Sequence, residues 1–158
     1  MVNKKLSKII NLMARKDQEM RKSEVFDPSV DIKNTGLLKK IIRQSGWPTT
    51  SLVGKKASNN AWLIAQHADC DLKFQKLCLK LIKKAVLPKN VDTKNVAYLT
   101  DRILVSLGKK QIYGTQFYKD EFGKLVPRPI KEIEALDKRR RNMNLGTFEN
   151  YKKKMEKL

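Results

Sequence analysis

Three features of this 158-residue sequence predict a mainly α fold, a compact bundle of about six to seven helices with one small β-hairpin near residues 111–127. Apolar residues make up 41% of the chain, enough to bury a core, and there are only 7 Gly and 5 Pro. Apolar residues recur every three or four positions over most of the chain. Only residues 111–127 are dominated by aromatic and β-branched types, which favour strands. We expect a single globular domain over residues 5–157.

The first two helices are predicted from apolar stripes. The first stripe runs from Leu6 to Met20 and is interrupted by an acid, Asp17. The first sixteen residues of the chain are basic and could imitate a transit peptide. The apolar period continues to Met20, however, and favours a structural helix. A short second helix follows the turn-prone Asp27-Pro28-Ser29 and stops at Gly46. Its apolar face contains Leu37, Leu38, Ile41 and Ile42.

Three helices are expected in the middle of the chain. A mostly buried helix spans about Ala57 to Ala68, and the best-defined helix carries apolar residues from Phe74 to Ala85 and ends at Pro88. Its opposite side is lined by lysines, namely Lys73, Lys76, Lys80, Lys83 and Lys84. The third helix is capped by Asp92 or Thr93 and reaches Gly108.

Toward the end of the chain, the spacing of apolar residues changes from that of a helix to that of a strand and then back to that of a helix. On an alternating first strand, one face would carry Gln111, Tyr113 and Thr115, and the other Ile112 and Gln116. A turn around residues 119–123 leads to the second strand, and two helices follow. One lies around Ile130 to Met143, and the other is capped by Thr147 and turns Phe148, Tyr151 and Met155 inward.

The chain is strongly basic, with 35 Lys and Arg against 16 Asp and Glu, a formal charge of +19. Such a surface attracts polyanions, so nucleic acid, an anionic small molecule or an acidic protein are the partners it favours. Alternatively, the lysines only solvate the helices. The candidate nucleic-acid-binding residues are Lys73, Lys76, Lys80, Lys83, Lys84, Lys152, Lys153 and Lys154.

Several classes of protein are disfavoured. The longest uninterrupted apolar stretch, Ala61 to Ala65, is far shorter than the ~20 residues that cross a bilayer. Cys70 and Cys78 stand eight residues apart in what we expect to be one helix, roughly 12 Å, too far for a disulfide. With no signal-peptide pattern before them, we expect a reducing, cytoplasmic compartment.

Motifs for cofactors, metals and a serine nucleophile are absent from the sequence. Neither G-x-x-x-x-G-K-[ST] nor G-x-G-x-x-G occurs, so no nucleotide cofactor is predicted, and G-x-S-x-G is missing too. His67, Asp69, Cys70 and Asp71 are clustered, but the chain has one His and two Cys, so we predict no metal site.

His67 is the natural candidate for a general acid or base, because an unperturbed imidazole titrates near neutral pH. Asp69 follows closely enough to orient it, although a lone histidine at a helix end can also be a satisfied core or capping group. Asp17, with Arg21 one turn later, and Arg140 stand where apolar residues are expected. Either they form a buried structural pair, such as Asp17 with Arg140, or they line a polar pocket.

A second group of polar residues follows in the last third of the chain. Asp101 and Arg102 lie on a predicted helix, and the segment from Gln111 to Gln116 supplies several donors and acceptors. These groups suit either recognition of a polar ligand or satisfaction of buried backbone, and both interpretations stay open.

Seven short sequence motifs, called boxes here, occur in an order that resembles a widespread bacterial domain family of unknown function. That family is marked by the boxes Gln-His-Ala-Asp and Tyr-Gly-Thr-Gln. In this chain the seven boxes are Asp17-Gln18 with Arg21, Gly46-Trp47-Pro48-Thr49, Gly54, Gln66-His67-Ala68-Asp69, Ala97-Tyr98-Leu99 with Asp101-Arg102, Gln111 with Tyr113-Gly114-Thr115-Gln116, and Arg139-Arg140. The resemblance covers roughly residues 5 to 155 and implies a single domain whose boxes converge on a ligand pocket. The site residues it implies are Asp17, Gln18, Arg21, Gln66, His67, Asp69, Asp101, Arg102, Gln111, Tyr113, Thr115, Gln116, Arg139 and Arg140. Members of the family are not generally this basic, and the resemblance implies no reaction.

Two functions of different class follow. The first is an enzyme of hydrolase or transferase type that acts on an anionic or phosphorylated small ligand, with His67 as acid/base and with Arg102 and Arg140 holding the anion. The alternative is a non-catalytic protein that binds nucleic acid or a ribonucleoprotein through its lysine-rich helix faces. A module that docks an acidic protein is a third hypothesis.

Overall fold

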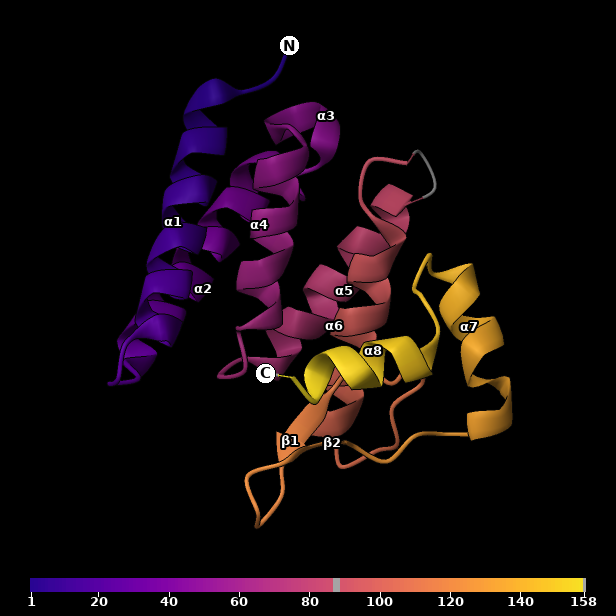
Figure 1. The fold of residues 1–158 in the computed structure, drawn as a ribbon. Helices are drawn as coiled ribbons and strands as arrows, with labels where there is room; N and C mark the ends of the chain where they lie inside the picture. Colours follow the sequence, from indigo (N-terminus) through magenta and orange to yellow (C-terminus); the bar gives the residue numbers. More distant parts are fainter. Residues whose placement is uncertain (87–88, 158) are drawn as a thin grey trace. The chain divides into compact units, whose positions relative to one another are not determined.

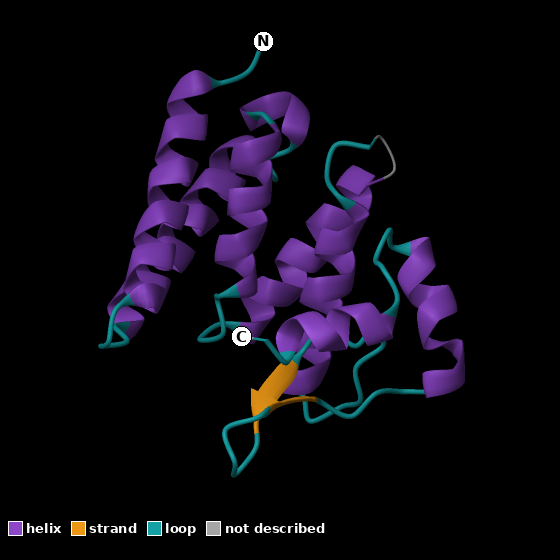
Figure 2. Cartoon of the chain, viewed as in Figure 1, coloured by secondary structure: helices purple, strands orange, loops and turns teal. Residues whose placement is uncertain are grey.

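A computed structural model describes residues 1–86 and 89–157 (Figure 1). Within these residues the chain forms eight α-helices, one short 3₁₀ helix and one two-stranded antiparallel hairpin (Figure 2). The prediction of a mainly α fold with one small hairpin is therefore confirmed. The chain divides into two compact units, Met1–Asn95 and Val96–Leu158, and passes from the first to the second within helix α6. The single domain over residues 5–157 stays a prediction.

The first unit is built around a central helix. It contains α1 (Lys4–Lys22), α2 (Pro28–Ser45), α3 (Thr50–Val53), α4 (Lys55–Gln66) and α5 (Leu72–Val86). Helix α4 packs against all four of the others. Its buried face consists largely of small side chains, Ala57, Ala61 and Ala65, which let neighbouring helices approach closely.

Local capping chemistry sets the ends of these helices. Asp27 accepts from the Ser29 backbone N–H and begins α2 with Pro28 in its first turn. Gly46 ends the same helix with φ +72°, as predicted. At 18 residues, α2 is longer than the short helix we expected, and its buried face is narrower: Leu38 and Ile41 are buried, whereas Leu37 is 43% exposed.

Helix α5 shows the predicted two-sided pattern except at Leu77, an apolar-face residue that is 47% exposed. Phe74, Cys78, Ile82 and Ala85 are buried, and the lysines on the other side are exposed. Pro88, the predicted stop, lies outside the described residues. Cys70 lies in the turn before α5 rather than within one helix with Cys78, and both thiols are free.

The second unit combines α6 (Thr93–Ser106) with the hairpin and short helices. Strands β1 (Phe117–Lys119) and β2 (Leu125–Pro127) pair antiparallel, with Tyr118 opposite Val126. The 3₁₀ helix η1 (Ile133–Ala135), α7 (Leu136–Asn142) and α8 (Phe148–Met155) follow. Asp92 caps α6 and Thr147 caps α8, in agreement with the sequence patterns.

Two expectations about this unit are wrong. The helix expected from Ile130 starts at Leu136, because Glu132 has a left-handed backbone (φ +44°), and Ile133 is 57% exposed. The first strand does not include residues 112–116, so the alternating faces expected there do not exist. Residues 112–116 form a loop that follows the bridge between Gln111 and Ile130, because backbone N–H groups of the loop turn toward a carboxylate instead of a partner strand.

None of the helices in the described residues combines the length and apolar composition that crossing a membrane requires.

Candidate functional site

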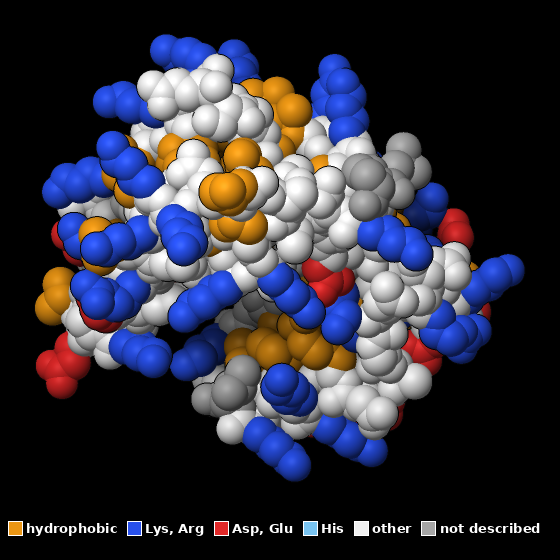
Figure 3. Space-filling view, turned by 90° about the horizontal axis from the view of Figure 1, so that it is seen from above, with side chains coloured by type: hydrophobic (Ala, Val, Ile, Leu, Met, Phe, Trp, Pro, Cys, Tyr) orange, Lys and Arg blue, Asp and Glu red, His pale blue; other side chains and the backbone are white. Residues whose placement is uncertain are grey.

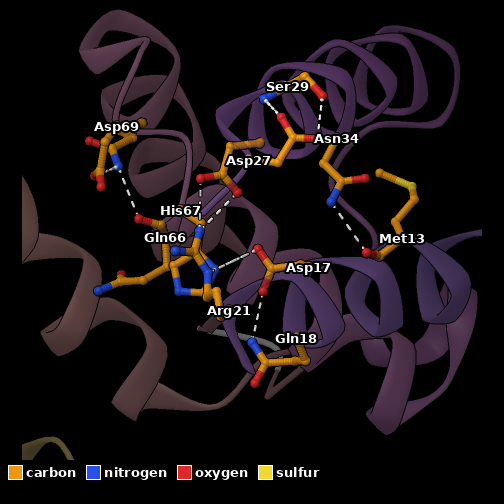
Figure 4. A network of polar contacts seen from close by, with 12 residues as sticks. Met13, Asp17, Gln18, Arg21, Asp27, Ser29, Asn34, Gln66, His67 and Asp69 are labelled. Atoms are coloured by element: carbon orange, nitrogen blue, oxygen red, sulfur yellow. Dashed lines mark hydrogen bonds and ion pairs between the residues drawn. The ribbon is translucent and has the colours of Figure 1, made fainter. Parts of the chain in front are cut away.

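His67 lies in a cluster of charged side chains from three helices of the first unit. It directly follows α4, and its Nδ1 lies 2.7 Å from Oδ1 of Asp17 on α1. Arg21, one turn after Asp17, places its Nε 3.0 Å from the same ring nitrogen. Figure 4 shows Asp17 between Gln18 on one side and the His67 and Arg21 side chains on the other. Residues 50 positions apart thus form one polar cluster.

Asp17 and Arg21 both contact the same ring nitrogen of His67, Nδ1. Burial works against the charged form of this carboxyl, but the hydrogen bond and charge of His67, with help from Gln18 and Arg21, hold the pKa of Asp17 below its ordinary value. The Asp17 carboxylate can only accept a hydrogen bond from Nδ1, whereas the Arg21 Nε–H can only donate one to it, so the two contacts favour opposite tautomers of the ring. The other ring nitrogen, Nε2, has no hydrogen-bond partner within residues 1–86 and 89–157.

Two further side chains complete the cluster. Arg21 Nη2 donates to both oxygens of Asp31 on α2, each at 2.8 Å, and Gln18 Nε2 donates to Asp17 Oδ2 at 2.7 Å. Asp31 was not among the predicted site residues, because an acid in the first turn of a helix is explained by the helix dipole alone. The charges of Asp17, Arg21 and Asp31 sum to −1, to which a protonated imidazole would add +1.

The predicted role of Asp69 belongs to Asp17. We expected Asp69 to orient His67, but the carboxylate on Nδ1 is that of Asp17. Asp69 Oδ1 instead accepts from Nε2 of Gln75, which also donates to the backbone carbonyl of Gln66. Proximity along the chain was misleading because His67 marks the end of α4 and the chain turns there.

A second polar cluster lies in the second unit, where Asp101 of α6 holds the loop of residues 111–116. This completely buried carboxylate accepts from the backbone N–H groups of Ile112 (2.7 Å), Tyr113 (3.0 Å) and Thr115 (3.0 Å), and from the Thr115 hydroxyl (2.9 Å). Burial raises the pKa of Asp101, although the donors partly counteract it. Asp101 thus satisfies loop backbone that has no ladder partner.

Gln111 supports the loop from inside. Its side-chain amide is buried, donating to the carbonyls of Gln116 (3.0 Å) and Arg128 (2.8 Å) and accepting from the Gln116 N–H (2.9 Å). Gln116 Nε2 donates to the Thr115 hydroxyl, and Arg102 Nη1 lies 3.5 Å from Gln116 Oε1. Burial raises the pKa of Tyr113, the half-buried member of the group.

Two of the three arginines of α7, Arg139 and Arg140, bind backbone carbonyls of the same loop. Arg140, 2% exposed, donates from Nε to Gly146 O at 2.7 Å and from Nη1 to Tyr113 O at 2.6 Å. Arg139 donates to the Ile112 carbonyl at 2.9 Å. The suggested pairing of Asp17 with Arg140 is therefore wrong, since each finds its partners in its own unit. Of the two interpretations of this group, these contacts favour satisfaction of buried backbone.

The predicted site residues thus fall into two sets. Asp17, Gln18, Arg21 and His67 meet in the first unit, with Gln66 and Asp69 close by in sequence. The set of the second unit comprises Asp101, Arg102, Gln111, Tyr113, Thr115, Gln116, Arg139 and Arg140. That both sets share one pocket stays a prediction.

A comparison with family models matches residues 16–158 to DUF6624, a family of unknown function. The chain belongs to this family. No curated protein and no solved structure matches it. The DUF6624 match begins one residue before Asp17 and so spans both polar clusters.

In this DUF6624 chain the exposed lysines differ in how far they are neutralised. Figure 3 shows a face on which Lys and Arg side chains project at many points and acidic side chains are few. On α8, Lys153 pairs with Glu149 of the same helix at 3.5 Å, and Lys152 pairs at 3.9 Å with Glu156, the residue that caps the helix. In the described part of the chain no ion pair is formed by the α5 lysines, although the charge of Lys73 helps to lower the pKa of Asp71; these lysines are Lys73, Lys76, Lys80, Lys83 and Lys84.

Among residues 1–86 and 89–157, no group of three or more His, Cys, Asp or Glu side chains is arranged to hold a metal ion.

Proposed function

We propose that this chain is an enzyme of hydrolase or transferase type in which His67 is the general acid/base. The observation that carries this proposal is the 2.7 Å contact between His67 Nδ1 and the buried Asp17 carboxylate. In this proposal Nδ1 donates to Asp17, and the carboxylate stabilises the imidazolium that forms when the other ring nitrogen takes a proton. His67 Nε2 is the nitrogen left for that transfer.

The substrate class in this proposal is an anionic or phosphorylated small molecule. His67 Nε2 takes a proton from an attacking water or acceptor hydroxyl and returns it to the leaving oxygen. Within the described residues, the hydrogen-bond partners of His67 include no Ser or Cys side chain, which favours direct attack over a covalent intermediate on the protein. The cluster itself carries no net positive charge, so attraction of an anion falls to the surrounding Lys and Arg.

A purely structural role for His67, joining α1 to α4, is the competing interpretation. His67→Gln separates the two, because Gln can still donate to Asp17 but cannot transfer a proton at neutral pH. With p-nitrophenyl phosphate and bis(p-nitrophenyl) phosphate as probes, we expect the variant to lose at least about 100-fold in kcat/KM. Its Tm should stay close to that of the unmodified chain.

Lys22→Gln is the matched control and should keep full activity. Lys22 is exposed at the end of α1, the helix that carries Asp17 and Arg21. Equal turnover by the unmodified chain and His67→Gln would overturn the proposal, as would absence of turnover of both esters by the unmodified chain. A collapse of the fold in His67→Gln would support the structural role.

Nucleic-acid binding is the second candidate, and the unpaired lysines of α5 favour it. These five side chains are exposed on one helix, where they can contact successive phosphates. In fluorescence anisotropy with labelled RNA, we expect Lys80→Gln/Lys84→Gln to weaken binding and to flatten its salt dependence. Lys152→Gln/Lys153→Gln should have less effect, because both lysines already pair with glutamates. No binding at low salt would eliminate this candidate.

A reducing, cytoplasmic compartment is part of the proposal, supported by two free thiols, Cys70 and Cys78.

A further inference from the structure

A groove with a volume of about 770 Å³ runs along α1 beside α4, within the first unit. One wall consists of α1 side chains at helical spacing, from Lys4 to Gln18. Lys56 and Asn60, one turn apart on α4, contribute the opposite wall. Of its lining residues, Gln18 alone was among the site residues predicted from the sequence.

The groove is lined by cations and by no acid. Lys4, Lys8, Arg15 and Lys56 all line it. The three lysines have no acidic partner in the part of the chain that the structure describes, and Arg15 makes only an exposed contact with Glu19 at 3.5 Å. Their positive charge is therefore not neutralised within the protein, and a concave surface concentrates it.

Two amides supply uncharged hydrogen-bond donors between these cations. Asn60 Nδ2 donates to Asn11 Oδ1 at 2.8 Å, which leaves the Asn11 amide group to donate elsewhere. If the two amides are flipped, Asn60 has the unused donors instead, so either arrangement presents an NH₂ group to the groove. Ser7 adds a hydroxyl. Donors interleaved with cations are what phosphate oxygens require.

The length and the remaining lining limit what the groove can recognise. The fourteen-residue separation of Lys4 and Gln18 along α1 corresponds to about 21 Å, long enough for several consecutive phosphates. Leu12 and Ala14 add aliphatic surface, and none of the lining residues is aromatic, so stacking of bases is not provided. The groove is suited to a ligand read through its charge and oxygen atoms along its length.

We infer that this groove binds an extended chain of phosphates, either the backbone of a single-stranded nucleic acid or an inorganic polyphosphate. Gln18, at the end of the groove, donates to Asp17, the carboxylate that holds His67. That the groove binds phosphates does not depend on the proposed function. That it holds the substrate for His67 does rest on the proposed function.

The test compares two charge-reversal pairs that lower the net charge equally. Lys8→Glu/Lys56→Glu changes the groove, and Lys33→Glu/Lys40→Glu changes exposed lysines of α2 outside it. The ligands are fluorescein-labelled decauridylate, followed by anisotropy, and inorganic tripolyphosphate, followed by calorimetry and by competition. We expect the groove pair to weaken binding at least tenfold and the control pair to weaken it at most threefold.

Equal losses in the two pairs would overturn the inference, because they would indicate attraction by net charge alone. It would also be overturned if the unmodified chain bound neither ligand at low salt. Binding of both ligands with mutual competition supports recognition of the phosphate chain itself, and binding of decauridylate alone supports a nucleic-acid strand. Should a Glu pair fail to fold, the same comparison is made with Lys8→Gln/Lys56→Gln and Lys33→Gln/Lys40→Gln.

Two readouts separate this inference from the proposed function. In an NMR titration with tripolyphosphate, the side-chain amide signals of Asn11 and Asn60 should shift, and unchanged signals would contradict the groove. His67→Gln should bind both ligands as the unmodified chain does. Loss of turnover without loss of binding then tests His67, and loss of binding in the Lys8→Glu/Lys56→Glu pair tests the groove.

Discussion

Gly114 shows how a single residue enables the loop of residues 111–116. Its φ of +65° lies in the left-handed region, and a Cβ added there would lie 2.8 Å from Cε2 of the Phe148 ring. Both the backbone conformation and the space therefore require glycine. The loop can then turn its N–H groups toward Asp101 while Phe148 packs directly over it.

Gly114→Ala is expected to destabilise the protein by about 2 to 5 kcal/mol, the sum of left-handed strain and overpacking. Gly36→Ala is the control, because Gly36 lies in α2 with no atom within 4 Å of an added Cβ. That change should stabilise the fold by roughly 0.5 to 1 kcal/mol. Urea unfolding measures both, and equal stabilities of the two variants would contradict this account of Gly114.

Asp17 makes the stability depend on pH. Its folded pKa lies below the ordinary value of 3.8, so the folded state binds the proton less tightly than the unfolded state. The stabilisation is therefore present above the ordinary pKa and disappears as the pH falls through the folded pKa. Asp17→Asn should be less stable at pH 6 and lose less stability on acidification below about pH 4. Parallel curves of unfolding free energy against pH for the two proteins would contradict this.

At the scale of elements, buried side chains replace the hydrogen bonds that regular structure supplies. The loop of residues 111–116 has no ladder partner beyond Gln111, yet Asp101 accepts from three of its N–H groups. Arg139 and Arg140 of α7 satisfy its carbonyls. Helices α6 and α7 are thus joined through a loop rather than through direct packing alone, and the cost of burying backbone without partners is avoided.

Asp101→Asn should therefore cost about 2 to 4 kcal/mol, because an amide N–H would face backbone N–H donors. Amide protons of Ile112, Tyr113 and Thr115 should exchange faster with solvent. Asp120→Asn is the matched control, since Asp120 also accepts two backbone N–H groups, but in an exposed hairpin turn. Its cost should stay below about 1 kcal/mol. Equal costs would argue against burial as the cause.

For the whole molecule, the charge of +19 sets the conditions under which the fold is stable. Most Lys and Arg have no acid with which to pair, since they outnumber Asp and Glu by 35 to 16. Unneutralised like charges repel within the folded chain, and dissolved salt screens this repulsion. The same charge draws polyanions toward the protein before any specific contact forms.

The Tm is expected to rise as NaCl is increased from about 10 mM to 300 mM, because the Debye length shortens from roughly 30 Å to below 10 Å. A variant with all five α5 lysines changed to Gln should show a smaller rise. Thermal unfolding followed by circular dichroism measures both proteins. A Tm that falls with added salt would indicate that attractive ion pairs dominate instead.

Local pattern was sufficient for the parts of the fold that depend on neighbours in sequence. The apolar period located α5 and its exposed lysines, Gly46 and Thr147 marked helix ends, and the ordered boxes predicted the family. Residues 112–116 were wrongly predicted to be part of a strand, because β-branched and aromatic residues suit a strand as well as a packed loop. Sequence gives no sign of which of these a distant carboxylate will select.

The sequence by itself determined a basic, mainly helical chain of the DUF6624 family with His67 as its one histidine. Only the tertiary structure decided the partners of its polar residues: Asp17 for His67 across 50 positions, Asp101 for the loop, and backbone carbonyls for Arg140. The physical reason is the separation along the sequence over which each kind of interaction acts. Helices and caps arise from contacts within a few residues, whereas a buried charge is satisfied by whichever group the packing of other elements brings within about 3 Å.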